Sequence, residues 1–220
     1  MKYKAENSFD YENGFYLTSN YKRTGRLLAH YELYKIIASL EGDIVECGVF
    51  KGASLMRFIN FIQLFEQDKS FKRNVVGFDI FGKFPGTDFE PDKEELQAFI
   101  DETGGGISID KEELENYINL KKFVNYKLVK GDILQTVPKF VSDNPGTKIA
   151  LLNIDTDIYE PCKVILEQLA PRVIKGGVII FDDYGVFQGE TELADEYAAK
   201  HGFEIKSFDF TKVPYYLIKK

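Results

Sequence analysis

The chain of 220 residues has the length of one domain with a full-sized hydrophobic core. Its 44% hydrophobic and 29% charged residues are ordinary for a folded globular protein. A net charge of −7 and an isoelectric point near 5.1 disfavour nucleic acid or an anionic membrane as the main partner. We therefore expect a single domain over residues 1–220 and no nucleic-acid or membrane partner, while a small anionic ligand remains compatible with this charge.

The sequence carries no recognisable targeting or anchoring segment. No apolar run reaches membrane-spanning length, and the first residues, MKYKAENSFDYENG, lack the apolar centre of a signal peptide. The two cysteines, Cys47 and Cys162, lie in segments expected to face the core and are too few for a disulfide framework. These features predict a cytoplasmic protein.

An N-terminal segment and helix over residues 1–41 precede the first strand. Residues 1–20 are polar and aromatic without a clear period, so we expect them to lie across the surface. Residues 22–41 follow Asn20 as a helix candidate. Its apolar stripe consists of Leu27, Tyr31, Tyr34 and Ala38. His30 lies on or beside this stripe, where a packed or solvated role and a functional role are both open.

A strand, a glycine turn and the start of a helix follow from residue 42 to about residue 65. The strand is DIVEC, and the turn runs from Gly48 to Ser54. A turn of this kind can hold an anionic group on backbone N–H donors. Its spacing differs from the dinucleotide fingerprint G-x-G-x-x-G, and such turns also serve packing alone.

Two further strands precede the centre of the chain, and an acid follows each. NVVGFD ends in Asp79, which is placed to accept hydrogen bonds from ribose hydroxyls. YKLV is followed by Lys130-Gly131-Asp132. Between these strands, residues 85–123 form an acidic insertion with helix candidates at about 92–101 and 110–121. Insertions over a site are often lids, and a plain solvated insertion is the alternative.

The candidate chemistry is concentrated in residues 149–185. IALLNI and VIIF have the apolar composition of buried parallel strands, and an apolar period predicts a helix from Cys162 to Leu169 between them. Asp155 and Asp157 follow the first strand, and the Asp182-Asp183 pair follows the second. Because a right-handed crossover places both carboxyl ends at one edge of the sheet, we expect these acids to converge.

Four converging carboxylates repel one another unless a cation or shared protons relieve the repulsion. Oxygen ligands suit a hard ion such as Mg²⁺. Residues two apart in an extended segment point the same way, so Asp155 and Asp157 are expected to face one site, with Asp182 or Asp183 opposite. The alternative is that one or two of these acids cap the following helix.

The chain closes with a helix over 190–201 and two alternating strands over 203–210 and 213–218, an antiparallel pair. The complete order predicts an α/β fold of the Rossmann-like class I methyltransferase type. We expect a mostly parallel seven-stranded sheet, an antiparallel C-terminal hairpin and helices on both faces.

From about Gly42 to Gly185 the chain resembles the macrocin O-methyltransferase family of S-adenosylmethionine-dependent enzymes. The resemblance rests on DIVECGVFKGAS, FDIFGKFP, KGD, NIDTDIYEP and GGVIIFDDYG in this order. It implies S-adenosyl-L-methionine and Mg²⁺ as cofactors. It also implies an acceptor hydroxyl on a sugar, whether a deoxysugar, a nucleotide sugar or a glycosylated natural product.

The resemblance also implies roles for individual residues. The turn would hold the methionine moiety, Asp79 the ribose and Asp132 the adenine amino group. The residues assigned to the cofactor are Glu46, Gly48, Lys51, Gly52, Ser54, Asp79, Gly131 and Asp132. The implied metal ligands are Asp155, Asp182 and Asp183. Asp157 matches the proposed general base, so Asp157 and Asp155 are the expected catalytic pair.

Two rival functions stay open at this point. An Asp-x-Asp after an apolar strand also chelates the metal of a nucleotide-sugar glycosyltransferase, although the Glu46–Ser54 turn and Asp182-Asp183 disfavour this. A non-catalytic cofactor-binding domain is the other alternative, and the presence of all four candidate acids disfavours it. The sequence leaves open the acceptor, the methylated hydroxyl and the oligomeric state, for which a homodimer is one option.

Overall fold

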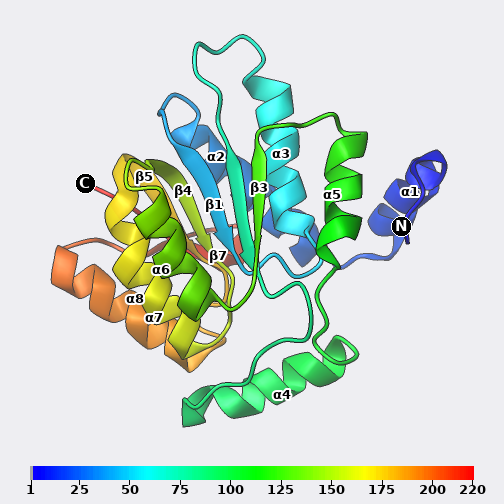
Figure 1. The fold of residues 1–220 in the computed structure, drawn as a ribbon. Helices are drawn as coiled ribbons and strands as arrows, with labels where there is room; N and C mark the ends of the chain where they lie inside the picture. The colour runs from blue at the N-terminus through cyan, green and yellow to red at the C-terminus, as the bar shows by residue number, and fades with distance from the viewer. Residues whose placement is uncertain (1) are drawn as a thin grey trace.

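A seven-stranded sheet lies between two layers of helices in the computed structural model, which describes residues 2–220 (Figure 1). The strand order is β3-β2-β1-β4-β5-β7-β6. The strands are β1 (Asp43–Cys47), β2 (Val75–Asp79), β3 (Tyr126–Lys130), β4 (Ile149–Ile154), β5 (Val173–Phe181), β6 (Lys206–Phe208) and β7 (Thr211–Ile218). Strands β1 to β5 pair in parallel, and β7 runs antiparallel to both β5 and β6. The predicted fold class is confirmed.

Each face of the sheet packs against its own layer of helices. One layer holds α2 (Tyr21–Ile37), α3 (Ala53–Phe65) and α5 (Lys111–Leu120), and the other holds α6 (Ile133–Asp143), α7 (Tyr159–Gln168) and α8 (Gln188–His201). Ile44 packs in the first layer's core with Phe58, whereas its neighbour Val45 packs in the second with Val137. Because successive strand residues face opposite layers, both faces of a central strand must be mostly apolar, as the run IALLNI is.

The N-terminal segment differs from the expectation of an aperiodic surface stretch. It contains a short 3-10 helix, η1 (Ala5–Asn7), and an 11-residue helix, α1 (Ser8–Thr18), in which no residue is buried. Figure 1 shows α1 beside the layered body and apart from it. An apolar period marks a helix only when one face packs against a core, so this helix has no such signal.

Some predicted boundaries were also wrong. Helix α2 ends at Ile37 instead of residue 41, and α7 begins at Tyr159 instead of Cys162. Strand β5 begins at Val173 and includes Gly176 and Gly177, so it is longer than the predicted strand VIIF. A side chain at Gly177 would meet the Ala150 carbonyl oxygen at 2.9 Å, so glycine there permits the close approach of β4, where the strand register shifts.

The acidic insertion divides into two parts with different surroundings. Helix α5 belongs to the first helical layer, with Leu114 and Ile118 buried in its core. The 3-10 helix η2 (Glu90–Asp92) and helix α4 (Lys93–Glu102) instead lie beyond the ends of the strands (Figure 1). The buried carboxylate of Asp92 accepts hydrogen bonds from the amides of Tyr159 (3.0 Å) and Gly189 (2.8 Å), in the first turns of α7 and α8. Only the α4 part is therefore placed as a lid, and its mobility stays a prediction.

Among the helices of residues 2–220, none combines the length and the apolar character that crossing a membrane requires.

Candidate active site

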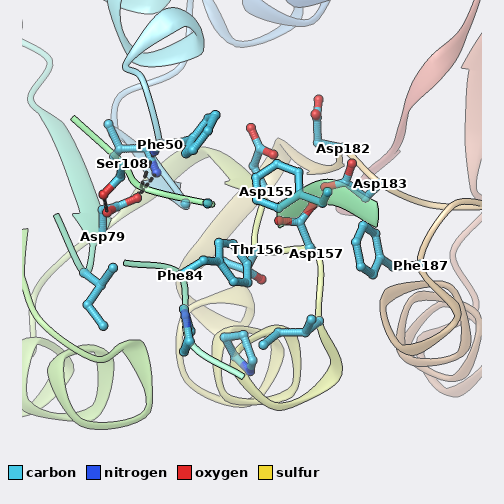
Figure 2. A pocket seen from close by; sticks show the side chains of 18 of the residues that line it. Phe50, Asp79, Phe84, Ser108, Asp155, Thr156, Asp157, Asp182, Asp183 and Phe187 are labelled. Atoms are coloured by element: carbon cyan, nitrogen blue, oxygen red, sulfur yellow. Dashed lines mark hydrogen bonds between the residues drawn. The ribbon is translucent and has the colours of Figure 1, made fainter. Parts of the chain in front are cut away.

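A cavity of about 880 Å³ lies at the carboxyl ends of the parallel strands, beneath α4. Figure 2 shows Asp79 with Ser108 at one end and the aspartates 155, 157, 182 and 183 at the other. Ten of the twelve predicted site residues line this cavity: Gly48, Lys51, Ser54, Asp79, Gly131, Asp132, Asp155, Asp157, Asp182 and Asp183. Glu46 and Gly52 are outside the lining.

The turn after β1 touches the acidic side of the cavity directly. Gly48 has φ +89°, and a Cβ there would lie 1.6 Å from the carbonyl oxygen of Asp155. No other residue fits this position, because both the backbone conformation and the contact exclude a side chain. The turn and the end of β4 are thereby held against each other.

Asp79 fixes the same turn from the other side. Its Oδ2 accepts hydrogen bonds from the amides of Val49 (2.9 Å) and Phe50 (2.8 Å), and its Oδ1 accepts from Phe81 N (2.5 Å) and Ser108 Oγ (2.8 Å). Four donors occupy the lone-pair sites of a carboxylate. Ribose binding by Asp79 stays a prediction, and it requires that a hydroxyl share or displace one of these donors.

The two predicted residues outside the lining, Glu46 and Gly52, contact other parts of the protein instead of the cavity. Glu46 is fully buried behind Ser54, and it accepts hydrogen bonds from Ser54 Oγ (3.0 Å) and Asn153 Nδ2 (3.3 Å). Burial raises the pKa of Glu46 to about 8. Gly52 has φ +81°, and a Cβ there would meet the Leu114 side chain at 2.9 Å, so this glycine admits α5. A direct cofactor contact of either residue stays a prediction.

Two other predicted cofactor residues also serve the local structure. Asp132 is the N-cap of α6, and its side chain accepts a hydrogen bond from Leu134 N at 2.9 Å. Lys51 lies over the Phe50 ring and donates to the carbonyl of Ile107. Both side chains remain at the cavity, where a ligand can reach them.

Three aspartates form a group suited to a metal ion. Asp155, Asp182 and Asp183 each offer one carboxylate oxygen, and these three oxygens lie within 4.8 Å of one another. They meet because Ile154 of β4 pairs with Phe181 of β5, the last residues of adjacent parallel strands. Asp182 Oδ1 and Asp183 Oδ2 are buried without a hydrogen-bond partner in the described chain. Orphaned hard oxygens of this kind fit Mg²⁺.

Asp157 reaches the cavity by a different route from the one expected. Its φ is +61°, so residues 155–157 are not extended, and the argument from two-residue alternation was wrong here. Its buried carboxyl group hydrogen-bonds with Asp183. Burial, followed by the charge of Asp155, raises the pKa of Asp157 to about 8. A non-glycine residue held in this strained conformation beside a cavity is a feature of functional sites.

The aspartates have a positive neighbour that sequence reasoning missed. Arg26 on α2 forms an ion pair with Asp182 at 2.9 Å. Burial favours the neutral form of Asp182, but His30 and Arg26 outweigh it and lower the pKa of this carboxyl below its usual value. Burial and neighbouring acids raise the pKa of both Asp155 and Asp183. The cluster therefore combines one ionised aspartate with two that favour the protonated form in the absence of a cation.

His30 and Glu190 complete the surroundings of the cluster. His30 is buried, stacks on Phe58 with centroids 5.2 Å apart, and places Nε2 3.8 Å from Asp182 Oδ1. Glu190, also fully buried, accepts a hydrogen bond from Asp183 N at 2.9 Å. The spacing of Arg26 and His30 on one helical face was a usable signal, whereas Glu190 was assigned only to the start of a helix.

The family follows from comparison with known proteins. A model of the Macrocin-O-methyltransferase (TylF) family matches residues 26–216. The chain belongs to this family. Over 78% of its length it is 26% identical to a Streptomyces olivaceus protein, 8-demethyl-8-(2,3-dimethoxy-alpha-L-rhamnosyl)-tetracenomycin-C 4'-O-methyltransferase. Over 74% of its length it is 25% identical to demethyldecarbamoylnovobiocin O-methyltransferase of Streptomyces niveus. These matches cover 64% and 60% of the relatives, so the chain spans less than two thirds of either.

Solved structures of methyltransferases have the same fold. The calicheamicin methyltransferase CalS11 superposes with a TM-score of 0.79 at 24% identity, over 99% of this chain and 87% of that one. Its apo structure, described as a TDP-rhamnose 3'-O-methyltransferase, superposes with a TM-score of 0.71 at 27% identity, over 98% and 86%. The class I methyltransferase fold predicted from the strand order is therefore confirmed.

Proposed function

We propose that the protein is an S-adenosylmethionine-dependent O-methyltransferase that methylates a sugar hydroxyl with the help of Mg²⁺. One observation carries this proposal: a single cavity joins the turn after β1, Asp79 and Asp132 to the three-aspartate group. A donor and an acceptor can thus meet in one enclosed space. The relatives named for rhamnosyl and novobiocin methylation support a sugar-containing acceptor.

The residues present fit both cofactors. The cavity is within the usual range for small-molecule sites, at their upper end, as two ligands require. The Asp79 and Asp132 end offers carboxylates to ribose and adenine, and the aspartate end offers only hard oxygen ligands. Mg²⁺ would be held by Asp155, Asp182 and Asp183, where it would lower the pKa of an acceptor hydroxyl and orient it.

The chain's own residues supply the remaining chemistry. In the proposed reaction, the hydroxyl oxygen forms a bond to the methyl carbon while the carbon–sulfur bond breaks, and S-adenosylhomocysteine leaves. Asp157 lies in the cavity beside Asp155 and Asp183, where its carboxylate is placed to accept the hydroxyl proton. Phe84 and Phe187 line the cavity and limit the entry of water. Holding donor and acceptor in line supplies much of the rate enhancement.

The test is methyl transfer from S-adenosylmethionine to a panel of nucleotide sugars and glycosylated acceptors, followed by mass spectrometry. We expect transfer with Mg²⁺, loss of transfer in EDTA and recovery when the ion is restored. Full activity in excess EDTA would refute the metal role. No binding of S-adenosylhomocysteine, together with tight binding of a sugar nucleotide, would refute the methyltransferase proposal and favour the glycosyltransferase alternative.

A further inference from the structure

Two arginine side chains on the cavity wall have no ion-pair or hydrogen-bond partner among residues 2–220. Arg23 on α2 and Arg57 on α3 both line the cavity, and within residues 2–220 neither side chain makes an ion pair or a hydrogen bond. The other Lys and Arg residues of the lining are engaged, because Arg26 pairs with Asp182 and Lys51 donates to a backbone carbonyl. The unpaired positive charge of the cavity therefore belongs to Arg23 and Arg57.

This pair is unfavourable as it stands. Arg57 is half-buried, and burial, followed by the charges of Arg23 and Arg26, lowers the pKa of its guanidinium. Placing like charges together in a partly desolvated site is unfavourable unless an anion joins them. The planar guanidinium matches the oxygens of a carboxylate or a phosphate, to which it donates two parallel hydrogen bonds. The geometry calls for a ligand with an oxyanion.

The position of Arg57 decides which oxyanion fits. It is one turn beyond Ser54 on α3, and residues three apart on a helix share a face. Glu46, which Ser54 contacts, and Asp182 both interact electrostatically with Arg57. Arg57 is thus located between the turn after β1 and the aspartates. If the turn after β1 holds the methionine moiety, as the family motif implies, Arg57 lies next to the expected place of its carboxylate.

We infer that Arg57 and Arg23 bind the carboxylate of the cofactor's amino-acid end. The inference rests on the proposed function and deepens it, since it assigns the cofactor's only carboxylate to two residues outside the predicted site. Arg57, the more buried of the two, makes the main contact, and the more exposed Arg23 closes the site from the rim.

The test compares two probes that differ only in this carboxylate. S-adenosylhomocysteine and its decarboxylated analogue, S-adenosyl-3-thiopropylamine, are titrated calorimetrically into wild type, Arg57→Gln and Arg23→Gln. Lys22→Gln is the matched control, because Lys22 is exposed on the same helix and outside the cavity lining. Wild type and the control should prefer S-adenosylhomocysteine by about 10- to 100-fold, the range of hydrogen bonds between charged groups. In Arg57→Gln this preference should fall below about 3-fold, and in Arg23→Gln it should fall in part.

The outcomes separate this inference from the function on which it rests. An undiminished preference in Arg57→Gln, or equal losses for both probes, would overturn the inference while leaving the methyltransferase proposal intact. TDP is titrated as a third probe. A variant that binds S-adenosylhomocysteine as wild type does but no longer binds TDP would show that the arginines hold an acceptor phosphate, which also overturns the inference. A wild type that binds neither probe would refute the proposed function itself. If circular dichroism shows that Arg57→Gln is unfolded, Arg23→Gln decides alone, since its side chain is exposed.

Discussion

Removing one aspartate from the metal group should stabilise the metal-free protein. The three oxygens lie within 4.8 Å of one another, and two charges at that distance repel by about 3 kcal/mol at an effective dielectric constant near 20. Protonation relieves part of this repulsion, because burial and neighbouring acids raise the pKa of Asp155. Asp155→Asn should therefore raise the free energy of unfolding by about 1–3 kcal/mol in EDTA, which raises the melting temperature by roughly 2–10 °C.

Magnesium should reverse this order. At about 100 times its dissociation constant, an ion that binds only the folded state adds about 2.7 kcal/mol, or roughly 5–10 °C for a chain of this length. Wild type should show this gain and Asp155→Asn should lose it. Differential scanning calorimetry with MgCl₂ at constant ionic strength measures both effects, and Asp209→Asn, an exposed acid between β6 and β7, is the control. Equal magnesium shifts in wild type and Asp155→Asn would refute the site, and a less stable Asp155→Asn in EDTA would refute the repulsion.

Three further predictions concern the base, a buried acid and the lid. Asp157→Asn should keep the magnesium shift but slow methyl transfer by about 10²–10⁴, the range of a general base, and an unchanged initial rate would remove that role. Glu46 has a folded pKa of about 8, above the ordinary 4.5, so its stabilising contribution is present below pH 4.5 and is lost as the pH rises to 8. Asp155, Asp157 and Asp183 titrate over the same window in both proteins, so the test is the difference: over that window wild type should lose about 2–4 kcal/mol more than Glu46→Gln. Parallel pH profiles of the two proteins in urea unfolding would contradict this. Asp92→Ala removes two hydrogen bonds to a charged acceptor, partly offset by relief of its desolvation, and should destabilise the protein by about 1–3 kcal/mol. Amide exchange should rise in α4, and unchanged protection there would show that Asp92 does not anchor the lid.

The positions of the strands and of most site residues were predictable because they depend on local pattern and on general rules of handedness. Short apolar runs mark strands that helices cover on both faces, and right-handed crossovers bring their carboxyl ends to one edge. Asp155, Asp182 and Asp183 follow two such strands, so their convergence could be expected from sequence. The family motifs added the prediction that the protein is a methyltransferase, and the family match over residues 26–216 supports it.

What faces the cavity was decided only by the tertiary structure. Glu46 is in the motif, yet it is buried behind Ser54. The carboxylate of Asp79 already accepts four hydrogen bonds from within the protein. Arg57 lies outside the predicted site, yet its side chain lines the cavity and has no hydrogen-bond or ion-pair partner among residues 2–220. Contacts of this kind join residues far apart in the chain, so no local period encodes them. Whether a polar side chain meets the backbone, another side chain or a ligand depends on which helix packs over it, and that is set by the packing of the whole fold.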